Sequence, residues 1–236
     1  MKCLITGCGG FIGSHLAEYL LSLDQTVYGV GRQASLPLGH LSKVHVKQCD
    51  LLDKECVREI ILETRPQRIF HLASQTLIKP SWHDPELTIR TNVLGTLYLL
   101  DAVRDLGISP TIEIACSSGE YAAANDGRPI GEDQCLEPSS PYALSKLAQD
   151  HLAALYARAY EMNIIRLRPF SIIGPRKSGD VCSDFARDIV AIERGQRDCL
   201  SVGNLEAVRD FLDVRDAVVA FWLVAERGQL NDVYNI

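Results

Sequence analysis

Tyr142 and Lys146 lie four residues apart in a stretch, Pro141–Tyr160, whose pattern predicts a long helix. Residues four apart share one face of a helix, so the phenol and the ammonium would be neighbours. A phenol with a pKa of about 10 is a poor acid or base at neutral pH, and a nearby ammonium lowers that pKa by favouring the phenolate. Ser118 follows a predicted strand, and its hydroxyl could hold a substrate carbonyl oxygen beside Tyr142. These three side chains predict a proton relay suited to hydride transfer.

A glycine-rich segment, TGCGGFIG from Thr6 to Gly13, lies between the first predicted strand and the first predicted helix. Gly7 can adopt the positive φ of a tight turn, Gly10 lets backbone amides approach a pyrophosphate, and Gly13 allows close packing of helix on strand. The helix N-terminus adds partial positive charge. This segment predicts a dinucleotide site, and the missing GK[ST] sequence excludes a P-loop NTPase.

The choice between nicotinamide cofactors is expected to depend on the end of the second predicted strand. There the chain reads Val30-Gly31-Arg32-Gln33, with no acidic residue to bind the ribose hydroxyls. Arg32 is placed to meet a 2′-phosphate instead, so the sequence favours NADP(H) over NAD(H).

Short apolar runs alternate with longer stretches of helical period, which is the pattern of βαβ units around a parallel sheet. The predicted strands are Lys2–Thr6, Val27–Val30, Val44–Val46, Arg68–His71, Thr111–Ala115 and Ile164–Leu167. The predicted helices are Phe11–Leu23, a helix capped by Asp53 and running to Glu63, Pro85–Leu106 and Pro141–Tyr160. We therefore expect an α/β fold with a doubly wound parallel sheet, the Rossmann fold.

The alternation of strand and helix patterns ends at Pro169, and a loop-like segment and short elements follow. We predict a dinucleotide-binding domain over residues 1–168 and a small, incomplete substrate lobe over 169–236. The strand predicted at 232–236 would return to the sheet.

Composition excludes several classes of protein. With 24 Lys and Arg against 30 Asp and Glu, the net charge of −6 argues against a nucleic-acid binder. No apolar run approaches the roughly 18 residues of a membrane helix, and no signal peptide is visible, so a cytoplasmic protein is expected. The eight cysteines form no CxxC pair and have no histidine pair at ligand spacing, which predicts reduced thiols and no metal site.

Together with HLAS at His71–Ser74 and TNVLGT at Thr91–Thr96, these motifs resemble the extended short-chain dehydrogenases/reductases of the nucleotide-sugar epimerase/dehydratase group. The resemblance covers essentially the whole chain. Within the group, RPFSIIGP at Arg168–Pro175 and VGNLEAVRDFLDVRD at Val202–Asp216 are most similar to enzymes that reduce GDP-4-keto-6-deoxy-D-mannose. The resemblance implies reduction of the C4 ketone to give GDP-D-rhamnose, with Tyr142 as the proton donor.

The resemblance also assigns contacts residue by residue. It implies cofactor contacts from Gly7, Gly10, Phe11, Ile12, Gly13, Arg32, Asp50, Leu51, Leu72, Ala73, Asn92, Tyr142, Lys146 and Pro169. It implies substrate contacts from Ser171, Arg176 and Arg209. Among these, the guanidinium of Arg209 suits the substrate diphosphate.

Other activities of the same group stay open. Hexose 4,6-dehydratases of the group carry an additional acid–base pair directly after the catalytic Ser or Thr. Here Gly119 and Glu120 follow Ser118, so half of that pair is missing, although Glu120 could serve as a catalytic base at C5. The missing acidic residue after the second strand disfavours a C4 epimerase, which holds NAD tightly. A relative that binds the cofactor without turnover is a further alternative.

Members of this group commonly dimerise through two long helices. Apolar stripes on the two predicted helices therefore indicate a homodimer, and they consist of Leu94, Leu97 and Tyr98 on the first and Ala148, Leu152, Leu155 and Ala159 on the second. Extended members continue well past residue 236, so the chain is expected to stop within its substrate lobe. Cofactor binding is accordingly expected more firmly than turnover.

Overall fold

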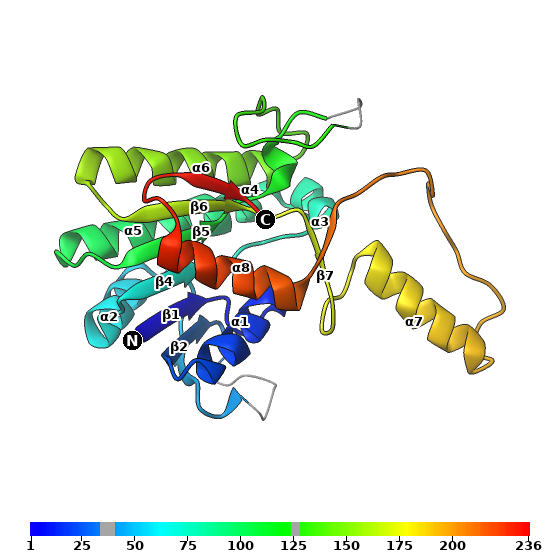
Figure 1. Ribbon diagram of the computed structural model, residues 1–236, viewed down its shortest axis with the longest axis horizontal. Coiled ribbons are helices and arrows are strands. Elements are labelled where there is room, and N and C mark those ends of the chain that lie inside the picture. Colours follow the sequence, from blue (N-terminus) through cyan, green and yellow to red (C-terminus); the bar gives the residue numbers. More distant parts are fainter. Residues whose placement is uncertain (34–40, 124–127) are drawn as a thin grey trace.

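The fold is taken from a computed structural model, which describes residues 1–33, 41–123 and 128–236. In this part of the chain, seven parallel strands form one sheet in the order β3-β2-β1-β4-β5-β6-β9 (Figure 1). They are β1 (Lys2–Thr6), β2 (Thr26–Gly31), β3 (His45–Gln48), β4 (Arg68–His71), β5 (Thr111–Ala115), β6 (Ile164–Arg168) and β9 (Val233–Asn235). The predicted doubly wound α/β fold is confirmed.

Helices cover both faces of the sheet. The first face packs against α2 (Lys54–Thr64), α5 (Gly95–Asp105) and α6 (Pro141–Tyr160), and the second against α1 (Phe11–Ser22) and α8 (Val214–Arg227). The central strands are apolar along nearly their whole length because both faces are buried. Leu4 and Ile69 are buried on the first face, and Ile5 and Phe70 on the second.

Capping side chains determine where α2 and α6 begin. The side chain of Asp53 accepts a hydrogen bond of 3.0 Å from the N–H of Cys56 and caps α2, as predicted. Ser140 caps α6 in the same way, by accepting from the N–H of Ala143 at 3.1 Å, and Pro141 takes the first helical position. These caps fix the start of the helix that carries Tyr142 and Lys146.

The stretch predicted as one helix over 85–106 consists of three segments. They are α4 (Pro85–Ile89), a π-helical segment (Arg90–Leu94) and α5, and a short helix, α3 (Ile78–His83), precedes them. π segments inside α-helices often occur at functional sites. Here the π segment carries Asn92, whose side chain is fully buried.

The chain leaves the sheet after β6 and returns to it at β9. Helix α7 (Val181–Glu193) has no buried residue and projects away from the body (Figure 1). Two short parallel strands, β7 (Ser171–Ile173) and β8 (Phe211–Asp213), flank it in sequence. Helix α8 then returns to pack against α1, and β9 pairs with β6. Residues 214–236 are thus part of the main body.

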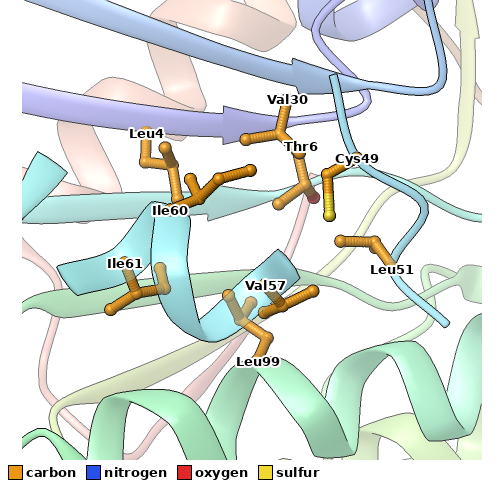
Figure 2. Close-up of a pocket in the computed structure, with 9 residues that line it drawn as sticks. All are labelled: Leu4, Thr6, Val30, Cys49, Leu51, Val57, Ile60, Ile61 and Leu99. Carbon is orange, nitrogen blue, oxygen red and sulfur yellow. The ribbon is translucent and has the colours of Figure 1, made fainter. Parts of the chain in front are cut away.

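A small void lies under α2, next to the ends of β1 and β2 (Figure 2). It encloses about 10 Å³, and Thr6 is the one polar residue among those that line it. A space of this size holds no more than one water molecule, so it is no ligand site.

Among the described residues, no helix is both long and apolar enough to cross a membrane.

Candidate active site

The glycine-rich turn joins β1 to α1 and leaves no room for side chains at two of its positions. Gly7 has a φ of +71°, and a Cβ there would lie 2.9 Å from the Cα of Ala73. A Cβ on Gly13 would lie 2.3 Å from the carbonyl oxygen of Gly7. Gly10 caps α1 without any side-chain hydrogen bond, so no side chain of the described residues competes for the N–H groups of the first turn. This uncapped helix N-terminus beside a side-chain-free turn suits a dinucleotide diphosphate.

The other predicted cofactor residues lie along the same edge of the sheet. Arg32 is exposed just after β2, and Asp50 is exposed just after β3. The Leu51 side chain points into the core under α2 (Figure 2), so only its backbone can face an adenine. After β4, the half-buried Leu72 and Ala73 are anchored to Thr6, whose carbonyl and hydroxyl oxygens accept from their N–H groups at 3.3 and 3.1 Å.

Tyr142 and Lys146 face the carboxyl end of β5 from α6. The ammonium of Lys146 is buried, and it donates to the carbonyl oxygen of Ala115 at 2.6 Å and to Oε1 of Gln149 at 2.9 Å. The Ser117 hydroxyl lies beside the Tyr142 phenol and acts on its pKa. Hydroxyl, phenol and ammonium are thus gathered where ligands of open α/β sheets bind.

Ser117 is the serine whose hydroxyl acts on the phenol, and the catalytic role of Ser118 stays a prediction. Ser117 Oγ accepts from the N–H of Gly119 at 3.1 Å, which leaves the hydroxyl proton free for the phenol. Ser118 opens a 3₁₀ turn (Ser118–Glu120), and its hydroxyl has no hydrogen-bond partner among the described residues. The Ser-x-x-Glu spacing of a capping box, Ser117 to Glu120, was the sequence signal that could have identified Ser117.

Burial is the largest effect on the pKa values of Tyr142 and Lys146. It lowers the pKa of Lys146 to about 8, against raising effects of the Cys116 thiol and the Glu120 carboxylate. Burial also raises the pKa of Tyr142, which the hydrogen bond from Ser117 partly offsets. The lowered phenol pKa predicted from the sequence is therefore wrong for this state of the protein, because desolvation penalises the phenolate.

Glu120 does not face the site. Its carboxylate is fully buried, Oε1 accepts from the N–H of Ser117 at 2.8 Å, and Oε2 lies 3.3 Å from Nε of Arg168. Arg168 also pairs with Asp150 of α6 at 2.9 Å. Burial raises the pKa of Glu120, and the nearby Asp150 adds to the effect. In this structure the carboxylate is turned inward, and the role of Glu120 as a C5 base stays a prediction.

Cys116, Glu120 and Asp150 place ligand-type atoms within 4.8 Å of one another. Arg168 contacts both carboxylates of this group, so a guanidinium already supplies the positive charge that a metal would bring. The arrangement is an internal ion-pair cluster.

Asn92 connects α6 to the loop after β4. Its amide nitrogen donates to Ser145 Oγ at 2.8 Å and to the carbonyl oxygen of Gln75 at 3.0 Å. Its amide oxygen accepts from Ser74 Oγ and from the N–H of Gln75. All four hydrogen bonds of the amide are made within the protein, so Asn92 joins α6 to this loop, and its contact with a cofactor stays a prediction.

The predicted substrate residues are not gathered around Tyr142. Arg176 is bound by Glu18 of α1 through two hydrogen bonds of 2.8 and 2.7 Å, and its contact with a substrate stays a prediction. Arg209 lies in the stretch 201–210, which is exposed throughout. Ser171 is half-buried at the start of β7. Pro169 lies next to the site, because its carbonyl oxygen accepts from the N–H of Ser118 at 3.0 Å.

Comparison with known proteins places this arrangement in a family. The family model described as GDP-mannose 4,6 dehydratase matches residues 4–236. The chain belongs to this family of NAD(P)-dependent short-chain dehydrogenases/reductases. It is 34% identical over 238 residues to GDP-6-deoxy-D-mannose reductase from Pseudomonas aeruginosa, with 100% of this chain and 74% of the relative covered.

Two solved structures share the fold of the whole chain. The UDP-glucose 4-epimerase of Thermus thermophilus in complex with NAD has a TM-score of 0.88 at 31% identity, with 77% of its length covered. RMD from Pseudomonas aeruginosa complexed with NADPH has a TM-score of 0.86 at 32% identity, also with 77% covered. As a family member, the chain is related to dehydratases, reductases and epimerases that act on nucleotide sugars, and a nicotinamide cofactor and a nucleotide-sugar substrate follow from this membership.

Proposed function

We propose that the chain catalyses NAD(P)H-dependent reduction of the C4 ketone of GDP-4-keto-6-deoxy-D-mannose, giving GDP-D-rhamnose. The observation that carries this proposal is the buried Lys146 ammonium at the carboxyl end of β5, with Tyr142 and the Ser117 hydroxyl beside it, on the same sheet edge as the glycine turn. The 34% identity with a reductase of this substrate class supports the choice of sugar.

A nicotinamide dinucleotide held at the glycine turn would supply the hydride for C4 in the proposed reaction. Tyr142 Oη gives its proton to the C4 oxygen, while the Ser117 hydroxyl stabilises the negative charge that develops on that oxygen. Lys146 opposes the charge left on the phenolate, which favours proton release from a phenol that burial makes a weak acid. Solvent returns the proton to the phenolate after the product leaves.

For the cofactor, we propose contacts from the glycine turn through Gly7, Gly10, Phe11, Ile12 and Gly13, with Leu72, Ala73 and Pro169 lining its path. NADP(H) is proposed over NAD(H) because Arg32 is the exposed charged side chain that follows β2, where no carboxylate competes. The NADPH complex of the Pseudomonas structure supports this choice. Asp50 and the backbone of Leu51 are proposed to contact the adenine.

We propose that residues 169–213 carry the substrate contacts, with Ser171 and Arg209 among them. A homodimer is proposed through α5 and α6. Leu155 on the outer side of α6 is 53% exposed and Tyr160 is 50% exposed, which supports a partner on that surface. The solution mass measured over a range of concentrations tests the dimer.

A 4,6-dehydratase is the second candidate, because the family model that matches the chain is that of the GDP-mannose dehydratases. The buried Glu120 and the glycine at position 119 weigh against it, since neither offers a base for the C5 proton. Separate incubations with GDP-mannose and with the 4-keto-sugar plus NADPH distinguish the two activities. NADPH oxidation equal to the loss of keto-sugar supports the reductase, whereas keto-sugar formed from GDP-mannose without net cofactor change supports the dehydratase. Cofactor binding without either reaction would indicate a silent relative.

A further inference from the structure

A continuous run of buried polar side chains connects Lys146 with the glycine turn. Lys146 Nζ donates to Gln149 Oε1 at 2.9 Å, and Gln149 Nε2 donates to Thr96 Oγ1 at 2.8 Å. Thr96 in turn contacts His71, and His71 contacts Thr6, the last residue of β1, each at 2.9 Å. None of these side chains belongs to a residue more than 3% exposed.

The partners of this run fix the position of every proton in it. Thr96 Oγ1 donates its single proton to the carbonyl oxygen of Asn92 at 2.6 Å. It must therefore accept from both Gln149 and Nε2 of His71. Nδ1 of His71 is then the acceptor, and the Thr6 hydroxyl donates to it. Thr6 in turn accepts from the N–H of Ala73 at 3.1 Å.

This assignment requires a neutral His71 that carries its proton on Nε2. Burial, with the nearby Lys146 adding to the effect, lowers the pKa of His71 to about 3, in agreement with the neutral form. Because each donor already has its acceptor, a proton could move along the run only if every hydrogen bond reversed. The run is suited to holding groups in place and not to conducting protons.

The Lys146 ammonium has three N–H bonds, and two of them are used by Ala115 and Gln149. The acceptors therefore determine the direction of the third N–H, which is the one left for a bound molecule. The groups that act electrostatically on Lys146 are the Cys116 thiol, the Glu120 carboxylate and the neutral His71 ring. None of these three accepts a hydrogen bond from the ammonium, and among the described residues Gln149 is the side chain that does.

We propose that Gln149 is a positioning residue for the Lys146 ammonium. Thr96, His71 and Thr6 would hold Gln149 at a set position relative to the glycine turn. The arrangement would align the ammonium with the cofactor-binding turn before any ligand arrives. This role rests on the proposed function only for its effect on turnover, since the placement of Lys146 is a property of the free protein.

The direct test is the NMR titration of Lys146 in the full chain, with ¹³Cε-labelled lysine and Lys146→Met for the assignment. Gln149→Leu removes an acceptor of the charged form, so we expect the pKa of Lys146 to fall by about 1. Gln149→Glu places a carboxylate beside the ammonium, so we expect that pKa to rise. Opposite shifts from two substitutions at one position are not produced by general loosening of the fold.

A second pair of variants tests the rest of the run. Thr96→Val removes the hydroxyl that holds Gln149 and should also lower the pKa of Lys146, whereas Thr96→Ser keeps the hydroxyl and should restore it. Thr64→Val is the matched control, because Thr64 is equally buried and its hydroxyl bonds only to Ile60 of its own helix. It should leave the titration of Lys146 unchanged.

An unchanged Lys146 titration in folded Gln149→Leu and Gln149→Glu would overturn the proposal, as would equal effects of Thr96→Val and Thr64→Val. If Gln149→Leu does not fold, the Gln149→Glu and Thr96 variants decide the outcome. Failure of the proposed function has a different signature. The parent protein would then leave NADPH and keto-sugar unchanged, while the titrations would still shift as expected.

Discussion

The carboxylate of Glu120 accepts a 2.8 Å hydrogen bond from the backbone N–H of Ser117, the residue whose hydroxyl contacts the Tyr142 phenol. The acid that follows the serine pair therefore acts on the serine from inside the protein. It shapes the 3₁₀ turn, and it links that turn through Arg168 to Asp150 on the helix of Tyr142 and Lys146. The relationship leads to two separate predictions.

The first prediction distinguishes the two adjacent serines. Ser117→Ala removes the hydroxyl beside the phenol and should lower kcat by about 10²–10³, the usual cost of one lost oxyanion donor. Ser118→Ala removes a hydroxyl with no partner among the described residues and should keep kcat within about threefold of the parent value, a free-energy change below 1 kcal/mol. Steady-state kinetics of the two variants are the measurement. A larger loss in Ser118→Ala than in Ser117→Ala would reverse our assignment.

The second prediction concerns Glu120. Glu120→Gln keeps an oxygen that can accept from Ser117, so ketone reduction should fall by less than about tenfold, well below the 10²–10⁴ that removal of a general base costs. The thermal melting temperature should decrease, because the buried Arg168 loses one of its two carboxylate partners. Loss of all turnover at an unchanged melting temperature would restore a catalytic role for this carboxyl.

The third prediction concerns the cofactor. Arg32→Ala should weaken NADPH binding by about 10- to 100-fold, which corresponds to one lost charge-assisted contact, and should leave NADH binding nearly unchanged. Arg58→Ala, at an exposed arginine of α2, is the matched control for a lost surface charge. Fluorescence titration with both dinucleotides gives the ratio of affinities. Equal weakening of both cofactors would contradict a 2′-phosphate contact.

The fourth prediction is thermodynamic and concerns Glu113 in the middle of β5. Its side chain is buried, and neither carboxylate oxygen has a hydrogen-bond partner among the described residues. Burial raises the pKa of the group well above its usual value, against a smaller lowering effect of Arg68. Above about pH 4.5 the unfolded chain releases this proton while the native chain retains it, so the free energy of unfolding falls as pH rises. Glu113→Leu should therefore raise the free energy of unfolding by about 1–3 kcal/mol, and more at pH 8 than at pH 5.

Urea unfolding at the two pH values tests this prediction. Glu59→Leu makes the same replacement at an exposed glutamate of α2 and serves as the control. Its free energy of unfolding should stay within about 0.5 kcal/mol of the parent value. A gain from Glu113→Leu that does not depend on pH, or a loss of stability, would show that the carboxyl has partners in solution.

The sequence was sufficient for the cofactor half of the fold. The strands from β1 to β6, the glycine turn and the cap of α2 by Asp53 could be predicted, because each depends on local patterns of apolar, glycine or capping residues. The π segment at Arg90–Leu94 could not, since its extra residue becomes visible only when Asn92 bonds to Gln75 and Ser145. Helix α8 was missed as an element because its apolar run is preceded by loop-like sequence.

The sequence placed Tyr142 and Lys146 on one face of a helix, which the structure shows as α6. The spacing of Tyr142 and Lys146 followed from helical period alone. The choice between Ser117 and Ser118 depended on the turn that follows β5, and the pKa of the phenol depended on burial, which local sequence does not reveal. Arg176 was assigned to a substrate, but its pairing with Glu18 arises from the packing of the 174–177 turn on α1, a contact between residues 158 positions apart.

The most direct test of the central claim follows NADPH oxidation with GDP-4-keto-6-deoxy-D-mannose for the parent and for Tyr142→Phe. Our account predicts that the parent consumes NADPH and forms GDP-D-rhamnose in equal amounts. Tyr142→Phe should bind NADPH as the parent does and lose at least about 10² in kcat, since the proton donor is gone. Reduction by Tyr142→Phe at the parent rate would contradict the account.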